Sequence, residues 1–154
     1  MNRRAVKRQA ATRLSDEDYV ALSAFRLALR RFLKFSEAGA HTYGLTAQQH
    51  QALLAVRAHR GEEPMSIGEL ADSLLIKNHS AVGLVARLQA RGLVVRKPSP
   101  GDRRRVLLAI TPEAQGMLDQ ISRGNLDELK SNAEAFEALL SSLRRIDARA
   151  AAED

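Results

Sequence analysis

Residues 66–111 read SIGELADSLLIKNHSAVGLVARLQARGLVVRKPSPGDRRRVLLAIT. The spacing of their apolar residues predicts two short helices separated by a turn, the second running from about His79 to Arg91. Two β-like runs follow, Leu93–Lys97 and Val106–Ile110, and predict a hairpin with arginines at its tip. Such a unit places one helix in the major groove of DNA and a basic loop on the neighbouring backbone or minor groove.

The charge of the chain is unevenly distributed. The sequence has 154 residues, enough for one domain with a substantial core, and a net charge of +6. Arg91–Arg105 holds six basic residues and one acidic residue, a net charge of +5, whereas Pro112–Asp154 holds nine acidic and five basic residues. Met1–Arg13 holds five basic residues and no acidic one. Positive charge at the hairpin and the N-terminus indicates a polyanionic partner.

Composition argues against several other classes of protein. The chain has no cysteine, which excludes disulfides, thiolate metal sites and cysteine-based redox sensing. No apolar run of a signal peptide follows the N-terminal charges, and no segment approaches the roughly 18 apolar residues of a membrane span. The sequence contains no glycine-rich phosphate loop and no paired His/carboxylate motif, which are patterns that would indicate an enzyme. We therefore expect a cytoplasmic protein with no catalytic residues, no cofactor and no membrane partner.

Capping residues mark the starts of several helices. Ser15 precedes three acidic residues that suit the positive end of a helix dipole. Thr46–Gln49 and Ser66–Glu69 both fit the capping-box pattern. Pro112 at a first helical position predicts a further helix after the hairpin. Before Ser15, the basic segment 1–14 is expected to be a flexible, solvated tail or, alternatively, an arm that touches phosphates.

The first and last helical segments carry apolar seams. The first segment is expected to end at a break bracketed by Gly39 and Gly44. In the last segment, apolar residues follow a 3-4-3-4 spacing over nearly three heptads: Leu126, Leu129, Ala133, Phe136, Leu140 and Leu143. This seam suits either the core of the domain or a second copy of the chain. Its length and its distance in sequence from the other core residues favour a homodimer, with interface residues Leu22, Leu129, Phe136, Leu140 and Leu143.

The helix from His79 to Arg91 has two distinct faces. Its inward face is predicted to be Ala81, Leu84, Val85 and Leu88, and its outward face His79, Val82, Gly83 and Ala86. Recognition helices meet base edges with their first turn, where Asn78, His79 and Ser80 are the short polar residues. Helix capping by Asn78 or Ser80 is the alternative. Gly83 suits a close approach to the sugar-phosphate edge, and Arg87 suits a phosphate or an internal acid.

The hairpin tip offers arginines to a narrow minor groove. Asp102 lies two residues before Arg104 and is expected to hold its guanidinium in a fixed fork. The alternative is a solvated basic loop in which Asp102 is a turn residue. The candidate DNA-binding residues are Lys77, Asn78, His79, Ser80, Gly83, Arg87, Asp102, Arg103, Arg104 and Arg105.

These residues carry a resemblance to a known family. The segments ELADSL, HSAVGLVARLQARGLVVR and GDRRRVLLAITPEA resemble the MarR family of bacterial winged helix-turn-helix transcriptional regulators, over about Ser15 to Ile146. Asp102 and Arg104, followed by Thr111, look like the D-x-R wing of that family and its next helix start. The resemblance implies a mainly α fold with a small β-hairpin wing. It divides the chain into a tail (1–14) and one domain (15–154), with dimerisation helices at 15–45 and 112–150 and a winged helix-turn-helix at 46–111.

The same resemblance implies how such a protein works. Family members are homodimers whose recognition helices enter successive major grooves of a near-palindrome of double-stranded DNA, with Arg104 as the minor-groove arginine. Many are repressors released by small aromatic or anionic effectors that bind between the dimerisation helices and the DNA-binding lobe. Residues near that pocket would be Phe25, Phe32, Phe35, His41, Tyr43 and His50, most of which suit a core equally well.

Other functions remain open at this point. The outward face of the recognition helix has few bidentate hydrogen-bonding side chains, which also suits a nonspecific nucleoid-type DNA-binding protein. A winged helix used for protein contacts is a second alternative. A zinc site formed by His41, His50, His59 and Glu62 is disfavoured, because ten-residue steps on different elements do not resemble a ligand pattern.

Overall fold

The computed structural model describes residues 14–102 and 104–152, so the predicted tail over residues 1–13 and Arg103 at the hairpin tip lie outside the described residues. The chain forms two compact units. The central unit is Leu33–Asp127, and the terminal unit combines Met1–Phe32 with Glu128–Asp154. Each unit is described below by itself.

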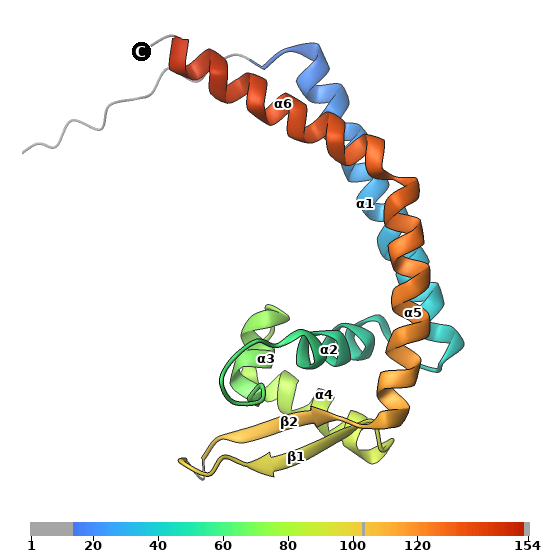
Figure 1. Cartoon of the computed structure of the whole chain (residues 1–154), viewed down its shortest axis with the longest axis vertical. Helices are drawn as coiled ribbons and strands as arrows, with labels where there is room; N and C mark the ends of the chain where they lie inside the picture. The colour runs from blue at the N-terminus through green and yellow to red at the C-terminus, as the bar shows by residue number, and fades with distance from the viewer. Residues whose placement is uncertain (1–13, 103, 153–154) are drawn as a thin grey trace, which may run out of the picture. The chain divides into compact units, whose positions relative to one another are not determined.

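The described residues are mainly helical, with one antiparallel hairpin (Figure 1). In chain order the elements are α1 (Asp16–Thr42), α2 (Ala47–Ala58), α3 (Ile67–Ser73), α4 (Asn78–Ala90), β1 (Val94–Pro98), β2 (Val106–Ile110), α5 (Pro112–Ser131) and α6 (Ala133–Ala152). This order confirms the predicted fold class, a helix-turn-helix followed by a β-hairpin wing between longer helices. No helix in the described part of the chain is long and apolar enough to cross a membrane.

Most helices begin where capping residues predict. Both capping boxes are formed: Thr46 accepts from the amide of Gln49, Ser66 accepts from that of Glu69, and each partner side chain bonds back. The predicted break after the first helix is partly wrong. Helix α1 runs through Gly39 to Thr42, and of the two glycines only Gly44 adopts a left-handed φ, 66°. A glycine in a helix costs roughly 1 kcal/mol, too little to end a long one.

The central unit has a closed apolar core. Helices α2, α3 and α4 pack beside the hairpin (Figure 1), and fully buried leucines fill the space between them: Leu45, Leu53, Leu70, Leu84, Leu88, Leu93 and Leu108. In the hairpin Val94 pairs with Ile110, and Pro98 with Val106. The amide of Leu108 also donates to the carbonyl of Met65 at 2.8 Å. The wing is therefore tied by its backbone to the segment that joins α2 to α3.

In the terminal unit α6 lies beside the first half of α1. The rings of Phe25 and Phe136 meet edge to face with centroids 5.5 Å apart. The buried carboxylate of Asp18 accepts from Ser142 Oγ at 2.9 Å. The predicted single seam is interrupted, because α5 ends at Ser131 and α6 begins at Ala133, on either side of Asn132.

The seam residues differ in how far the chain covers them. Leu129 and Phe136 are partly buried, whereas Leu22, Leu126, Leu140 and Leu143 are exposed. The four exposed leucines leave an apolar surface on α1, α5 and α6.

Candidate nucleic-acid interface

Helix α4 presents its first turn to solvent. Its N-cap is Lys77, which makes no side-chain capping bond, and Asn78, His79 and Ser80 are all exposed residues inside the helix. The alternative in which Asn78 or Ser80 caps this helix is therefore wrong. The amide of Ser80 donates to the carbonyl of Lys77 at 2.9 Å. Without a capping side chain, the amides of Asn78 and His79 suit an anion at the positive end of the helix dipole.

The two faces of α4 agree with the predicted pattern. Ala81, Leu84, Val85 and Leu88 are buried. On the opposite face Gly83 is half-buried, and a side chain added there would begin 3.5 Å from Nη1 of Arg87. Arg87 lies one turn after Gly83 in α4, and its guanidinium folds back along the helix to lie beside Gly83.

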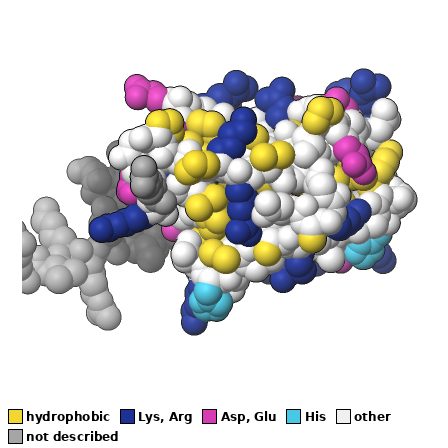
Figure 2. Space-filling model, turned by 90° about the horizontal axis from the view of Figure 1, so that it is seen from below, with side chains coloured by type: hydrophobic (Ala, Val, Ile, Leu, Met, Phe, Trp, Pro, Cys, Tyr) yellow, Lys and Arg dark blue, Asp and Glu magenta, His cyan; other side chains and the backbone are white. Residues whose placement is uncertain are grey.

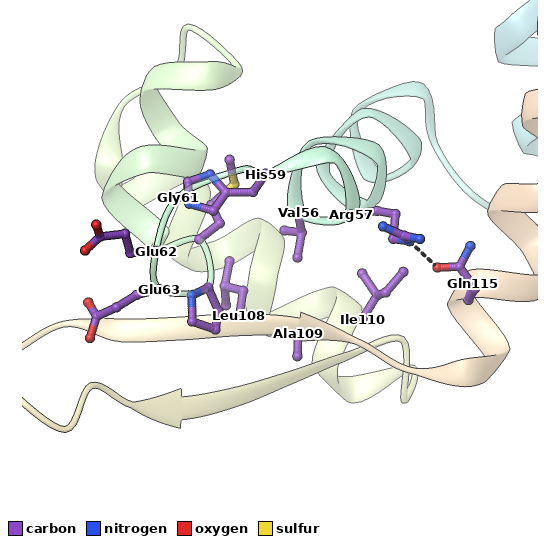
Figure 3. A pocket seen from close by; sticks show the side chains of 12 residues that line it. Val56, Arg57, His59, Gly61, Glu62, Glu63, Leu108, Ala109, Ile110 and Gln115 are labelled. Carbon is purple, nitrogen blue, oxygen red and sulfur yellow. Dashed lines mark hydrogen bonds between the residues drawn. The ribbon is translucent and has the colours of Figure 1, made fainter.

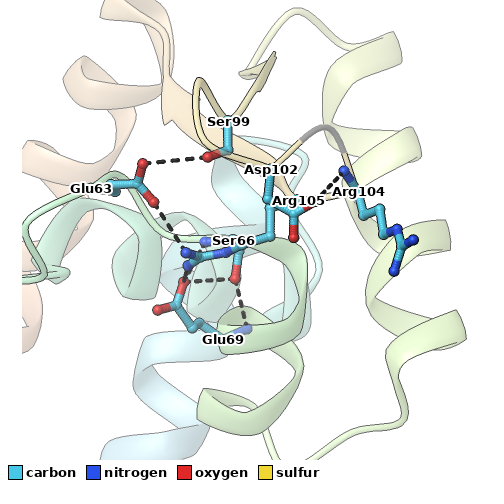
Figure 4. A network of polar contacts seen from close by, with 7 residues as sticks. All are labelled: Glu63, Ser66, Glu69, Ser99, Asp102, Arg104 and Arg105. Carbon is cyan, nitrogen blue, oxygen red and sulfur yellow. Dashed lines mark hydrogen bonds and ion pairs between the residues drawn. The ribbon is translucent and has the colours of Figure 1, made fainter.

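The turn at the hairpin tip is held by Asp102, but not as predicted. Asp102 Oδ1 accepts from the backbone amide of Arg104 at 2.9 Å, and its carbonyl accepts from the amide of Arg105 at 2.9 Å. The expected fork with the Arg104 guanidinium is not formed, since the nearer backbone donor takes the carboxylate. The Arg104 side chain is exposed and points away from the neighbouring polar network (Figure 4).

Arg105 lies differently from Arg104. Its guanidinium contacts two carboxylates, with Nη1 at 3.1 Å from Glu63 and Nη2 at 3.2 Å from Glu69 (Figure 4). Hydrogen bonds from Ser66 lower the pKa of Glu69, and the charge of Arg105 lowers it further. Glu69 therefore stays ionised at neutral pH. Arg105 is predicted to contact DNA, and within the described residues the guanidinium of its side chain, which is 42% exposed, is paired with these two carboxylates.

Other hairpin cations are also engaged internally. Arg91 donates to the carbonyls of Gly44 at 2.6 Å and Tyr43 at 3.2 Å, next to the end of α1. Arg96 donates to the carbonyl of Val82 at 3.5 Å. With Glu63 and Glu69 nearby, the net charge of +5 counted along the hairpin sequence overstates the local charge. The sequence missed these pairings because the partners are far apart along the chain.

The charged side chains on the side where α4 and the hairpin lie are nevertheless mainly basic. Figure 2 shows Lys and Arg spread over this face, interspersed with apolar side chains, and few acidic ones. The side chains of Lys97 and Arg104 are exposed, and neither makes a hydrogen bond to another of the described residues. This combination of an uncapped helix start and an exposed wing arginine suits phosphate and groove contacts.

A separate pocket of about 450 Å³ lies between the α2–α3 segment, β2 and the start of α5 (Figure 3). Arg57 Nε donates there to Gln115 Oε1 at 2.7 Å. None of the aromatic or histidine residues expected near an effector pocket lines it. His41, His50 and His59 with Glu62 do not gather into a metal-binding group, and the described residues contain no other such group.

Comparison with known proteins agrees with this geometry. A model of the MarR family matches residues 43–105. The chain is 36% identical to the HTH-type transcriptional repressor NicR of Pseudomonas putida over 109 residues, 66% of each chain. It is 30% identical to the HTH-type transcriptional regulator MhqR of Bacillus subtilis over 111 residues, 69% of this chain and 74% of that one. The chain belongs to the MarR family of transcriptional regulators.

A solved structure shows the same fold. The transcriptional repressor CouR, bound to a 23-mer DNA duplex, is 26% identical with a TM-score of 0.61, over 79% of this chain and 89% of that one. Family membership confirms the expectation of a DNA-binding winged-helix regulator rather than an enzyme.

Proposed function

We propose that the chain is a sequence-specific repressor that acts in the cytoplasm as a homodimer on a near-palindromic operator. The observation that carries this proposal is the exposed, uncapped first turn of α4 beside a wing whose Arg104 points outward. A helix start that offers amides and short polar groups suits a groove lined by phosphates.

The proposed DNA contacts are of different kinds: some reach base edges and others reach the sugar-phosphate backbone. Asn78, His79 and Ser80 reach base edges in the major groove, and Arg104 enters the adjacent minor groove. Lys77 and Arg87 contact phosphates, and Gly83 lets the backbone approach the sugar-phosphate edge. Asp102 shapes the tip through its bond to the Arg104 amide. A DNA contact is proposed for Arg103 as well, a residue that lies outside the described residues.

The homodimer forms through the terminal helices, with 15–45 and 112–150 as dimerisation segments and 46–111 as the winged helix-turn-helix. Leu22, Leu140 and Leu143 support this assignment, since each is a large apolar residue left exposed by its own chain. Leu129 and Phe136 complete the seam. Burying exposed leucines contributes roughly 25 cal/mol per Å² of apolar surface, which favours association.

A small aromatic or anionic effector would release the repressor from DNA. This part of the proposal is based on family membership. A thermal-shift screen of aromatic acids tests it: an effector raises the melting temperature of the protein and weakens its binding to the operator. Acids that change neither quantity would argue against an effector of this class.

Footprinting tests the function itself. Duplexes selected from a random pool by the protein should share a near-palindrome, and the protein should protect that sequence at nanomolar concentration. Uniform coating of all duplexes would instead indicate a nucleoid-type protein. No protection at low salt would indicate a winged helix used for protein contacts.

A further inference from the structure

A polar network joins the hairpin to the segment before α3. Glu63 lies in that segment, and Glu69 lies in the first turn of α3. Both carboxylates meet the guanidinium of Arg105 at 3.1 and 3.2 Å (Figure 4). Directly after β1, Ser99 Oγ donates to Glu63 at 3.3 Å, and the Ser99 amide donates to the carbonyl of Arg105 at 3.0 Å.

The network lies where the wing leaves the body of the central unit. Closer to the body, backbone contacts already hold β2: Leu108 donates to Met65, and Ser66 forms a bridge with Leu107. Beyond Arg105 only the tip turn remains, held by Asp102. Arg105 directly precedes β2. Among the described residues, it is thus the side chain nearest the tip that ties the wing to α3.

We propose that Arg105 is a positioning residue, which fastens the wing to Glu63 and Glu69 so that the adjacent Arg104 is presented to DNA. Two neighbouring arginines on the same tip then have opposite tasks, one facing inward and one outward (Figure 4). Arg105 makes no contact with DNA in this arrangement. The inference rests on the proposed minor-groove contact of Arg104.

Neutralising the two carboxylates separates this role from simple electrostatics. In the variant Glu63→Gln/Glu69→Gln, two negative charges near the DNA-facing surface are lost, and general electrostatics alone would strengthen DNA binding. If the network positions the wing, the variant binds its operator more weakly, by roughly 3- to 10-fold, because a mobile wing must be ordered on binding. Glutamine at position 69 can still complete the capping box, so α3 should remain folded.

Two further measurements sharpen the test. Arg105→Gln should weaken binding by a similar factor without changing the salt slope, whereas loss of a phosphate contact makes the slope shallower by about 1. In an Arg104→Ala background, the double glutamine variant should cause no further loss, because the two effects share one contact. Lys97→Gln is the matched control, an exposed cation on the same hairpin outside the network.

The outcomes are distinct. Tighter or unchanged binding by the double glutamine variant, or a shallower salt slope for Arg105→Gln, would overturn the positioning role. Additive losses in the Arg104→Ala background would do the same. Failure of the wild-type protein to protect any operator would contradict the proposed function instead. Thermal melts of each variant confirm that the central unit remains folded during these measurements.

Discussion

The core helices of the central unit and the helices of the terminal unit differ in how far the chain covers their leucines. In the central unit the leucines of α2, α3 and α4 are largely buried, and Leu53, Leu70 and Leu88 are almost completely covered by the chain itself. In the terminal unit Leu140 and Leu143 remain 53% and 49% exposed, and Val20 is 67% exposed. The central unit covers the core leucines of α2, α3 and α4 by itself, whereas the terminal helices keep large apolar side chains exposed.

The largest effect should follow from charged substitutions in the apolar seam of the terminal helices. Replacing Leu129 and Leu140 by Glu places charges in the proposed dimer seam, and we expect monomer or unfolded chain in light scattering. Leu75→Glu is the matched control, because Leu75 is 93% exposed in the turn after α3, in the central unit. A stable dimer of the double variant would contradict the assignment of the seam.

The next largest effect concerns DNA binding by the central unit. Arg104→Ala should weaken operator binding by about 1–3 kcal/mol, the range for one well-placed arginine. Arg31→Ala, which removes an exposed arginine of α1 in the terminal unit, should cost far less. Titrations at one salt concentration measure both changes. Equal losses would mean that the wing contributes only general charge.

Sequence periodicity predicted the closed unit well. The buried face of α4 and both capping boxes follow from local spacing, and β2 was predicted with its observed bounds. These features depend on residues within four positions of one another, where pattern and structure are closely linked. The break at Asn132 was missed, because the apolar heptads continue across it. Its side chain donates to the carbonyl of Glu128 at 2.8 Å, at the end of α5.

Polar pairing across the chain was the least predictable. Arg105 and Glu63 are 42 positions apart, and no spacing rule links them. Asp102 lies next to three arginines in the sequence, yet its carboxylate bonds to a backbone amide. A backbone donor two residues away is fixed in place, whereas a guanidinium must lose rotamer freedom to reach the same oxygen. Local geometry therefore prevailed over the charge pattern.

A smaller effect tests why α4 contains a glycine. Gly83→Ala should stabilise the central unit by roughly 1 kcal/mol, since alanine is the better helix former and the site leaves ordinary contact distance to Arg87. If the backbone at Gly83 approaches the sugar-phosphate edge, the same variant binds DNA more weakly despite its higher stability. Thermal melts and operator titrations measure the two quantities separately. Tighter or equal binding would remove Gly83 from the interface.

The smallest effect concerns the buried His50 of the closed unit. His50 is 3% exposed, its Nε2 has no hydrogen-bond partner in the described part of the protein, and burial lowers its pKa from the ordinary 6.5. Below about pH 6.5 the unfolded chain therefore binds a proton that folded His50 does not, so the free energy of unfolding falls as the pH decreases toward the lowered pKa. Denaturant titrations between neutral and mildly acidic pH should show this decline. In His50→Gln, the slope of the free energy of unfolding against pH should be smaller by the contribution of one proton. If the variant and the wild-type protein lose stability in parallel, His50 is not the group responsible, and its neutral form is not required by the core.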